Sequence, residues 1–269
     1  MKSGIKSIAV TLAATVICAW ASSSYGTVLF SEAFNYTAPS SLGTSVNPGN
    51  STAWNGGNSG LTIGSGNLTY AGLADQGGNE LSISNATAGS SVNTFANQTS
   101  GQVYYSFLLN VLTVDGGNNY FTALNPGTGA PNGGSDAIDA YLYSNGKIGL
   151  RTAGASTVTS ASALSLNTTY FVVEEYDITA QKAYLYLNPT PGGSQPAATL
   201  TLSSVTAVTA IDDVGFKAAA TTGAYLVDNL LVGTTWGDVT PTVPEPSTFA
   251  LMGIGLGVMA VVIRRRHKS

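Results

Sequence analysis

Apolar and polar residues alternate through most of the middle of this chain, which is typical of half-buried β-strands. Clusters of Gly and Asn separate the alternating segments, and Asn145-Gly146 is a strong signal for a two-residue hairpin. The pattern predicts strands at Thr27–Phe34, Leu61–Tyr70, Glu80–Ser84, Gln102–Val114, Tyr120–Asn125, Ala137–Ser144, Lys147–Thr152, Tyr170–Tyr176, Lys182–Asn188, Ala198–Leu202, Asp213–Ala218 and Ala224–Val232. No convincing helical pattern interrupts them, so we expect an all-β fold.

The strands follow one another without a linker that would divide the chain into domains. No internal repeat is evident either, which argues against a solenoid or a propeller. We therefore predict one antiparallel β-sandwich, a jelly roll, over residues 27–241. Residues 1–26 and 242–269 are expected to have other roles.

The first 26 residues have the three-part layout of a secretory signal peptide. Lys2 and Lys6 precede an apolar stretch, Ile8–Trp20, and small residues follow it. Cleavage is expected after Ala21 or after Gly26. The chain's single cysteine, Cys18, falls inside this leader, so the mature body has no disulfide and no cysteine nucleophile.

The last residues combine a Pro-Glu-Pro sequence, an apolar run and a basic cluster. The run from Ser247 to Ile263 is 17 residues long, roughly 25 Å as a helix, which is at the short end for a transmembrane helix. Arg264, Arg265 and Arg266 follow it and predict a cytoplasmic tail. With a signal peptide in front, the body is expected outside the inner membrane.

This C-terminal layout closely resembles the PEP-CTERM sorting signal of Gram-negative bacteria. The resemblance assigns the motif to Pro244, Glu245 and Pro246. It implies that an exosortase, a membrane protease-transferase, recognises this region, and that the helix is a temporary anchor. It also implies a product on the cell surface or in the exopolysaccharide matrix. Physically, the two prolines keep the motif extended and out of the helix, so that an enzyme can bind it.

Three segments of the body resemble concanavalin A-like, laminin-G-like jelly rolls. They are the long strand GQVYYSFLLNVLTV, the hairpin TTYFVVEEYDITAQKAYLYLNP and the closing segment GAYLVDNLLVGTTWGDVTP. The similarity covers most of residues 27–241 through loose motifs. It implies a two-layer sandwich of the kind found in bacterial surface proteins.

Charge narrows the range of partners. Residues 27–241 contain four basic and thirteen acidic residues, a net charge of −9. Such a surface repels phosphate backbones, so nucleic acid is not an expected partner.

The sequence carries no complete catalytic motif. The only histidine, His267, belongs to the basic tail, which rules out a histidine base in the body. Glu175 and Asp177 match two positions of a carboxylate pattern used by one group of jelly-roll glycosidases, but the third position is Ala180. We interpret this stretch as a strand end with a turn aspartate, and expect a protein without enzymatic activity.

Aromatic residues offer candidate glycan contacts, because sugar rings stack on aromatic faces. Tyr141 and Tyr143 share one strand face, as do Tyr184 and Tyr186. Trp54 and Trp236 complete the candidate set, with core packing as the alternative for all six. No cofactor is expected, and no metal site is assigned.

Calcium remains an alternative, because two loops are rich in oxygen ligands. The candidate ligands are Asp115, Asn118, Asn119, Asp136 and Asp139, although their spacing matches no calcium loop.

These observations predict an exported bacterial surface protein, sorted by an exosortase-type enzyme, that binds extracellular polysaccharide or helps to build that matrix. The first alternative is a carboxylate-dependent glycoside hydrolase or lyase. The second is a structural protein that self-assembles.

Overall fold

A computed structural model describes residues 26–243 except 50, 57–59, 85, 128, 130, 132–133, 205 and 220. The predicted signal peptide, apart from Gly26, lies outside the described residues. The Pro-Glu-Pro motif, the C-terminal apolar run and the arginine cluster also lie outside them. Among the described residues, no helix has both the length and the apolar character needed to cross a membrane.

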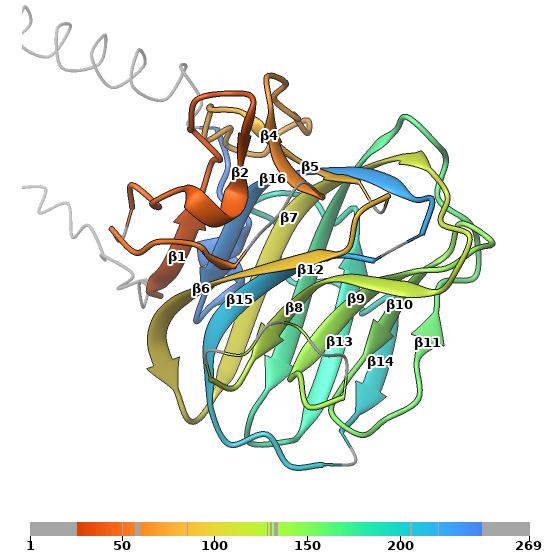
Figure 1. The fold of residues 1–269 in the computed structure, drawn as a ribbon. Helices are drawn as coiled ribbons and strands as arrows, with labels where there is room; N and C mark the ends of the chain where they lie inside the picture. Colours follow the sequence, from red (N-terminus) through yellow and green to blue (C-terminus); the bar gives the residue numbers. More distant parts are fainter. Residues whose placement is uncertain are drawn as a thin grey trace, which may run out of the picture.

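The described chain forms two antiparallel sheets packed face to face (Figure 1). The nine-stranded sheet has the order β14-β13-β12-β7-β16-β5-β4-β2, and β1 pairs with the second half of β16. Its strands are β1 (Val28–Glu32), β2 (Ser40–Ser41), β4 (Leu61–Gly64), β5 (Glu80–Ser84), β7 (Gln102–Thr113), β12 (Thr169–Asp177), β13 (Lys182–Leu187), β14 (Leu200–Ser203) and β16 (Ala224–Gly233).

The seven-stranded sheet has the order β11-β10-β9-β8-β15-β6-β3. Its strands are β3 (Asn55–Gly56), β6 (Gly89–Gln98), β8 (Asn119–Asn125), β9 (Ile138–Leu142), β10 (Ile148–Arg151), β11 (Val158–Thr159) and β15 (Ile211–Ala218). Two short helices complete the described elements, the 3-10 turn η1 (Leu42–Thr44) and α1 (Trp236–Val239).

The core lies between the sheets and follows the alternation of the sequence. On β12, Val172 and Tyr176 face the core, while Phe171 and Val173 face outward into a smaller cluster. Aromatic side chains fill the centre, with Phe107 against Tyr105 at 5.0 Å and against Phe121 at 5.9 Å between ring centroids. The all-β, antiparallel sandwich is therefore confirmed.

Most of the predicted strands are present, and the misses have local causes. β5 has the bounds that the pattern gives, whereas the segment predicted at Leu61–Tyr70 ends at Gly64. The ten-residue strand β6, GSSVNTFANQ, was not predicted, because Ser and Asn occupy its core-facing positions. Asn93, for example, is 1% exposed and bonds the backbone carbonyl of Thr52 through its amide nitrogen.

Candidate functional site

The six aromatic residues predicted as glycan contacts fall in three separate places. Tyr141 and Tyr143 lie on the outer face of the seven-stranded sheet. Tyr184, Tyr186 and Trp236 lie on the outer face of the nine-stranded sheet. Trp54 lies in the core between the sheets, so the six do not form one surface.

Trp54 is a packing residue, which corrects its expectation as a glycan contact. It is 1% exposed and packs against Phe216 at 5.6 Å and Phe30 at 5.9 Å between centroids. Its indole nitrogen donates to Glu32 at 2.9 Å. The Glu32 carboxylate also accepts hydrogen bonds from Asn47, from the Tyr36 hydroxyl and from the backbone of residue 34. A buried carboxylate with this many donors stabilises the fold around it.

A ladder of three tyrosines crosses the outer face of the seven-stranded sheet. The ring centroids of Tyr143 and Tyr141 lie 6.1 Å apart, and those of Tyr141 and Tyr120 lie 5.5 Å apart. The ladder arises because Tyr143 follows β9 directly, two residues after Tyr141, while Tyr120 on β8 is the cross-strand partner of Tyr141. We call these three residues the tyrosine ladder.

Two cations continue the ladder. Lys217, from β15, lies 4.1 Å from the Tyr120 ring centroid and also contacts its hydroxyl. Arg151, from β10, donates to the Tyr141 hydroxyl at 2.7 Å, and its guanidinium carbon lies 5.8 Å from that ring centroid. Two of the four basic residues of the acidic body therefore gather on this face.

Two buried carboxyl groups also belong to this face, and Asp139 is the cross-strand partner of Arg151. Asp139 and Asp213 are 1% and 0% exposed, and burial raises the pKa of both, that of Asp213 to about 8. Neither oxygen of Asp213 reaches hydrogen-bond geometry with a described group, although the Asn125 amide is close enough to oppose the rise in pKa. One oxygen of Asp139 and the Nε of Arg151 also lack a partner among the described residues. This face thus keeps polar atoms that the fold itself leaves unused.

The connection between β8 and β9 covers part of this face. The Tyr120 hydroxyl donates to the carbonyl of Pro131 at 3.1 Å. Gly215, on β15, leaves room for the Pro131 ring, because a Cβ at position 215 would lie 2.5 Å from its Cγ. The remaining accessible part is bordered by Tyr120, Tyr143, Lys217 and Arg151, which are each partly exposed.

The five candidate calcium ligands separate into two groups. Asp115 accepts hydrogen bonds from the Tyr225 hydroxyl at 2.9 Å and from the Asn119 amide at 3.0 Å, and the Asn118 side chain accepts from the backbone of Ser144. Asp136 and Asp139 belong instead to the outer face of the seven-stranded sheet, where each raises the pKa of Tyr120. In the described part of the chain, no group of three or more His, Cys, Asp or Glu side chains is arranged to hold a metal ion.

The neighbours Glu174 and Glu175 point to opposite sides of β12. Glu174 faces the interior, is 0% exposed and has no hydrogen-bond partner among the described residues, so burial raises its pKa to about 8. Glu175 faces outward and accepts from the Tyr186 hydroxyl at 2.7 Å and the Gln195 amide at 2.6 Å. Asp177 accepts from the backbone of Ala180 at 2.7 Å in the hairpin turn. The carboxylates proposed for the hydrolase alternative therefore already bind groups of the fold, and Glu174 cannot join them.

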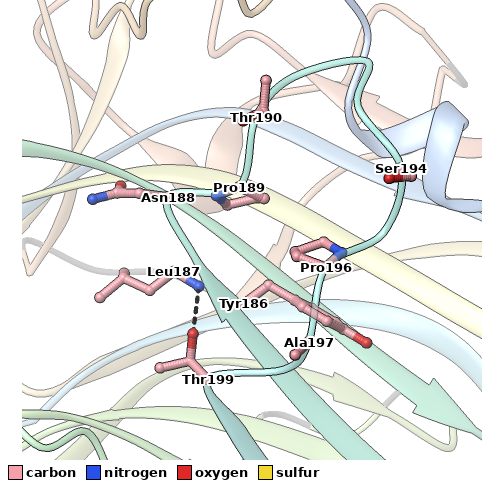
Figure 2. A pocket seen from close by; sticks show the side chains of 9 residues that line it. All are labelled: Tyr186, Leu187, Asn188, Pro189, Thr190, Ser194, Pro196, Ala197 and Thr199. Carbon is pink, nitrogen blue, oxygen red and sulfur yellow. Dashed lines mark hydrogen bonds between the residues drawn. The ribbon is translucent and has the colours of Figure 1, made fainter.

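A small pocket lies beside this cluster, on the outer side of the nine-stranded sheet (Figure 2). The loop after β13 arches over the strand end, and a hydrogen bond from the Leu187 backbone to the Thr199 hydroxyl, 3.1 Å long, closes its base. The pocket measures about 240 Å³ and is lined by residues 186–190, Ser194, Pro196, Ala197 and Thr199. Its lining carries no charged side chain, and the Tyr186 hydroxyl is bound by Glu175. The pocket is small, and its lining offers hydroxyl and amide groups but no charge.

Residues 242–266 match the family described as the PEP-CTERM protein-sorting motif. The chain carries an exosortase-type sorting motif. A protein with this motif is exported, processed at the membrane and released to the cell surface. This confirms the export to the cell surface that was predicted from the C-terminal residues. The match spans the predicted Pro244, Glu245 and Pro246 and the arginine cluster.

Comparisons with other proteins add the fold alone. No curated protein matches the chain. A sialidase superposes with a TM-score of 0.52 and 12% identity, over 86% of this chain and only 21% of its own length. The globular domain of T. cruzi calreticulin gives a TM-score of 0.45 at 11% identity, over 80% of this chain and 90% of its own length. An alginate lyase in complex with an alginate tetrasaccharide gives a TM-score of 0.46 at 13% identity, over 75% of this chain and 95% of its own. At 12% identity, the likeness to the sialidase shows a β-sandwich fold and says nothing of activity.

Three residues of the seven-stranded face escaped the sequence analysis. Tyr120, Arg151 and Lys217 lie on three different strands, and only the strand order brings them beside Tyr141. One signal was available, because these two cations are half of the basic residues in an otherwise acidic body.

Proposed function

We propose that this exported surface protein binds extracellular polysaccharide, without cleaving it, through the outer face of the seven-stranded sheet. The observation that carries the proposal is the tyrosine ladder with Lys217 and Arg151 at its side. Tyrosine faces offer stacking surfaces to the apolar sides of sugar rings, and the two cations offer donors to hydroxyl or carboxylate groups. The sorting motif supports the setting, since it directs the protein to the cell surface.

Arg151, a partly exposed cation with an unused nitrogen, favours this face over the other one. Arg151 Nε and the Asp213 carboxyl have no partner among the described residues, and an unused buried polar atom calls for an explanation. A hydroxyl-rich ligand, or water that bridges to it, can reach the partly exposed Arg151, whereas Asp213 is fully buried and is not a ligand contact. On the nine-stranded face, Tyr186, Gln195 and Glu175 satisfy one another, and the atom there without a partner among the described residues, Asn110 Oδ1, belongs to an uncharged side chain.

The test is a binding measurement with residues 26–243, which hold both sheets and the whole described core. Affinity for purified matrix polysaccharides is measured by calorimetry, with release of reducing sugar followed in the same samples. Tyr143→Ala removes one end of the ladder and is expected to weaken binding by about tenfold, the effect of roughly 1.4 kcal/mol of lost stacking.

Tyr184→Ala is the matched control, because Tyr184 is a partly exposed tyrosine on the opposite sheet. It is expected to leave the affinity unchanged. Equal losses in the two variants, or binding that persists in Tyr143→Ala, would place the ligand elsewhere. Release of sugar would replace the binding function by the hydrolase or lyase alternative, and binding only to other copies of the chain would favour self-assembly.

A further inference from the structure

The last described residues, 240–243, are fixed to the domain surface. We call them the exit strand. Three backbone hydrogen bonds hold it: Gly192 N donates to Thr240 O at 2.8 Å, Ala74 N to Pro241 O at 2.8 Å, and Val243 N to Gly72 O at 3.3 Å. An antiparallel β-bridge between Leu73 and Thr242 adds to them. The chain is therefore folded up to the residue before Pro244.

A glycine makes the close contact around the exit strand. Gly192 has φ +67°, in the left-handed region, and a Cβ there would overlap the Thr242 side chain. Pro191, its neighbour, approaches Gly72 from the other side, since a Cβ at position 72 would lie 3.9 Å from the Pro191 Cγ. Residues 72–74 and 190–193 thus enclose the exit strand, and together with it they form what we call the exit corner.

The exit corner is continuous with the rigid part of the fold. Just before the exit strand, α1 lies against the nine-stranded sheet, where Val239 is buried and its carbonyl accepts a hydrogen bond from Ser106. The indole of Trp236 donates to the carbonyl of Gly193 at 3.0 Å. Thr240 is 1% exposed. The corner therefore holds a fixed position relative to the nine-stranded sheet.

The sorting motif begins inside this corner. The family match starts at residue 242, and Thr242 is bridged to Leu73. The apolar run starts at Ser247, four residues after Val243. Four extended residues span at most about 14 Å. An enzyme in the membrane that reads the Pro-Glu-Pro must therefore work within about 14 Å of the folded domain.

We propose that the exit corner is a docking surface for the sorting enzyme, so that the enzyme recognises the Pro-Glu-Pro motif together with the folded domain that presents it. The surface suits close approach, because Gly72, Gly192 and Thr242 are exposed, small and uncharged. Val243, the residue next to the motif, is 52% exposed. The exit strand sets both the distance and the orientation of the motif relative to this surface.

The test follows processing of the full-length chain in cells that contain the sorting enzyme, as the rate at which the precursor band converts to the mature band. A flexible spacer of about ten Gly and Ser residues after Val243 separates the motif from the corner by roughly 17 Å. It is expected to slow processing by about tenfold, equivalent to roughly 1.4 kcal/mol of lost contact. Gly192→Ala, which displaces the exit strand, is expected to slow it in the same direction.

Two matched controls keep the result interpretable. The same spacer after Ser100, in the exposed turn between β6 and β7, tests the effect of an insertion alone. Gly237→Ala tests a glycine with open space around it. Both are expected to process at the unaltered rate, and thermal unfolding checks that every variant folds.

An unchanged rate with the spacer after Val243 would overturn the proposal, since the enzyme would then need only the motif. A faster rate would overturn it too, and would show that the folded domain obstructs the enzyme. Polysaccharide binding is measured on the same variants. It is expected to stay intact, so failure here and failure of the proposed function can be told apart.

Discussion

The outer faces of the two sheets differ in what their polar groups bind. On the nine-stranded face, Glu175 accepts two hydrogen bonds, and Tyr186 and Gln195 also contact each other at 2.5 Å. On the seven-stranded face, Asp213 has no partner among the described residues, and Arg151 keeps one nitrogen unused. Both faces carry tyrosines, so aromatic content alone does not distinguish them.

The geometry of the aromatic rings separates the faces further. Trp236 meets Tyr186 and Tyr104 edge to face, at 74° and 82° between ring planes, which is the geometry of packed aromatic side chains. On the seven-stranded face the neighbouring tyrosines are tilted by 40° and 49°, and both ends of the ladder are partly exposed. One face therefore packs its aromatic rings against each other, whereas the other leaves both ends of its ladder partly exposed.

The largest effect is expected on the nine-stranded face. Glu175→Ala leaves the Tyr186 hydroxyl and the Gln195 amide without their buried acceptor, and should lower the free energy of unfolding by about 3 kcal/mol. Urea unfolding of residues 26–243 measures this loss.

Glu175→Gln is the matched variant, because its amide oxygen still accepts one hydrogen bond. Its loss should be about 1 kcal/mol. Polysaccharide affinity is expected to stay unchanged in both variants at temperatures where they are folded. A specific loss of affinity would mean that the nine-stranded face takes part in binding, and the contrast between the faces would fail.

A smaller effect, dependent on pH, is expected on the seven-stranded face. Burial raises the pKa of Asp213 from 3.8 to about 8. The folded state then holds a proton that the unfolded state releases, so stability falls as the pH rises between these two values, by at most about 1.4 kcal/mol per pH unit. Asp213→Asn removes this dependence. It should match the unaltered protein near pH 4 and become steadily more stable than it as the pH rises toward 8.

The measurement is urea unfolding across this pH range, read as the difference between the two proteins. Glu174 and Asp228 also have raised pKa values, of about 8 and about 7, but they contribute equally to both. Parallel stability curves would show that Asp213 has partners in solution, and that the seven-stranded face is as well satisfied as the other.

The sequence predicted where the strands lie better than it predicted which side chains face the core. The alternation on β12 marks Val172 and Tyr176 as core, and the same alternation sends Glu174 inward, against its charge. Here the fold overrides hydrophobicity, because a protonated carboxyl can be buried at a cost that the rest of the core offsets. The strand β6 was missed for a similar reason, since polar side chains on its inner face bond the backbone.

The candidate site was only half predictable for a geometric reason. Tyr141 and Tyr143 were found because they are two residues apart in one predicted strand, where spacing alone gives a shared face, although β9 itself ends at Leu142. Tyr120, Arg151 and Lys217 join them through strand pairing over up to 97 residues of sequence. Trp54 was misassigned because a large aromatic ring suits a sugar-stacking surface as well as a core, and the sequence alone does not show that this side chain is 1% exposed.

The smallest effect compares one hydroxyl on each face. In Tyr141→Phe the Arg151 side chain loses the phenol acceptor that lies 2.7 Å from its Nη1. Tyr141 is only 6% exposed, so the free energy of unfolding should fall by about 1 kcal/mol. Tyr184→Phe, the control, should change it by less than about 0.5 kcal/mol, because its phenol lies nearer to solvent. Thermal unfolding resolves this difference. Since Tyr141→Phe also frees Arg151, it should alter polysaccharide affinity where Tyr184→Phe does not. Equal behaviour of the two variants would mean that the Tyr141–Arg151 pair serves neither the fold nor the ligand.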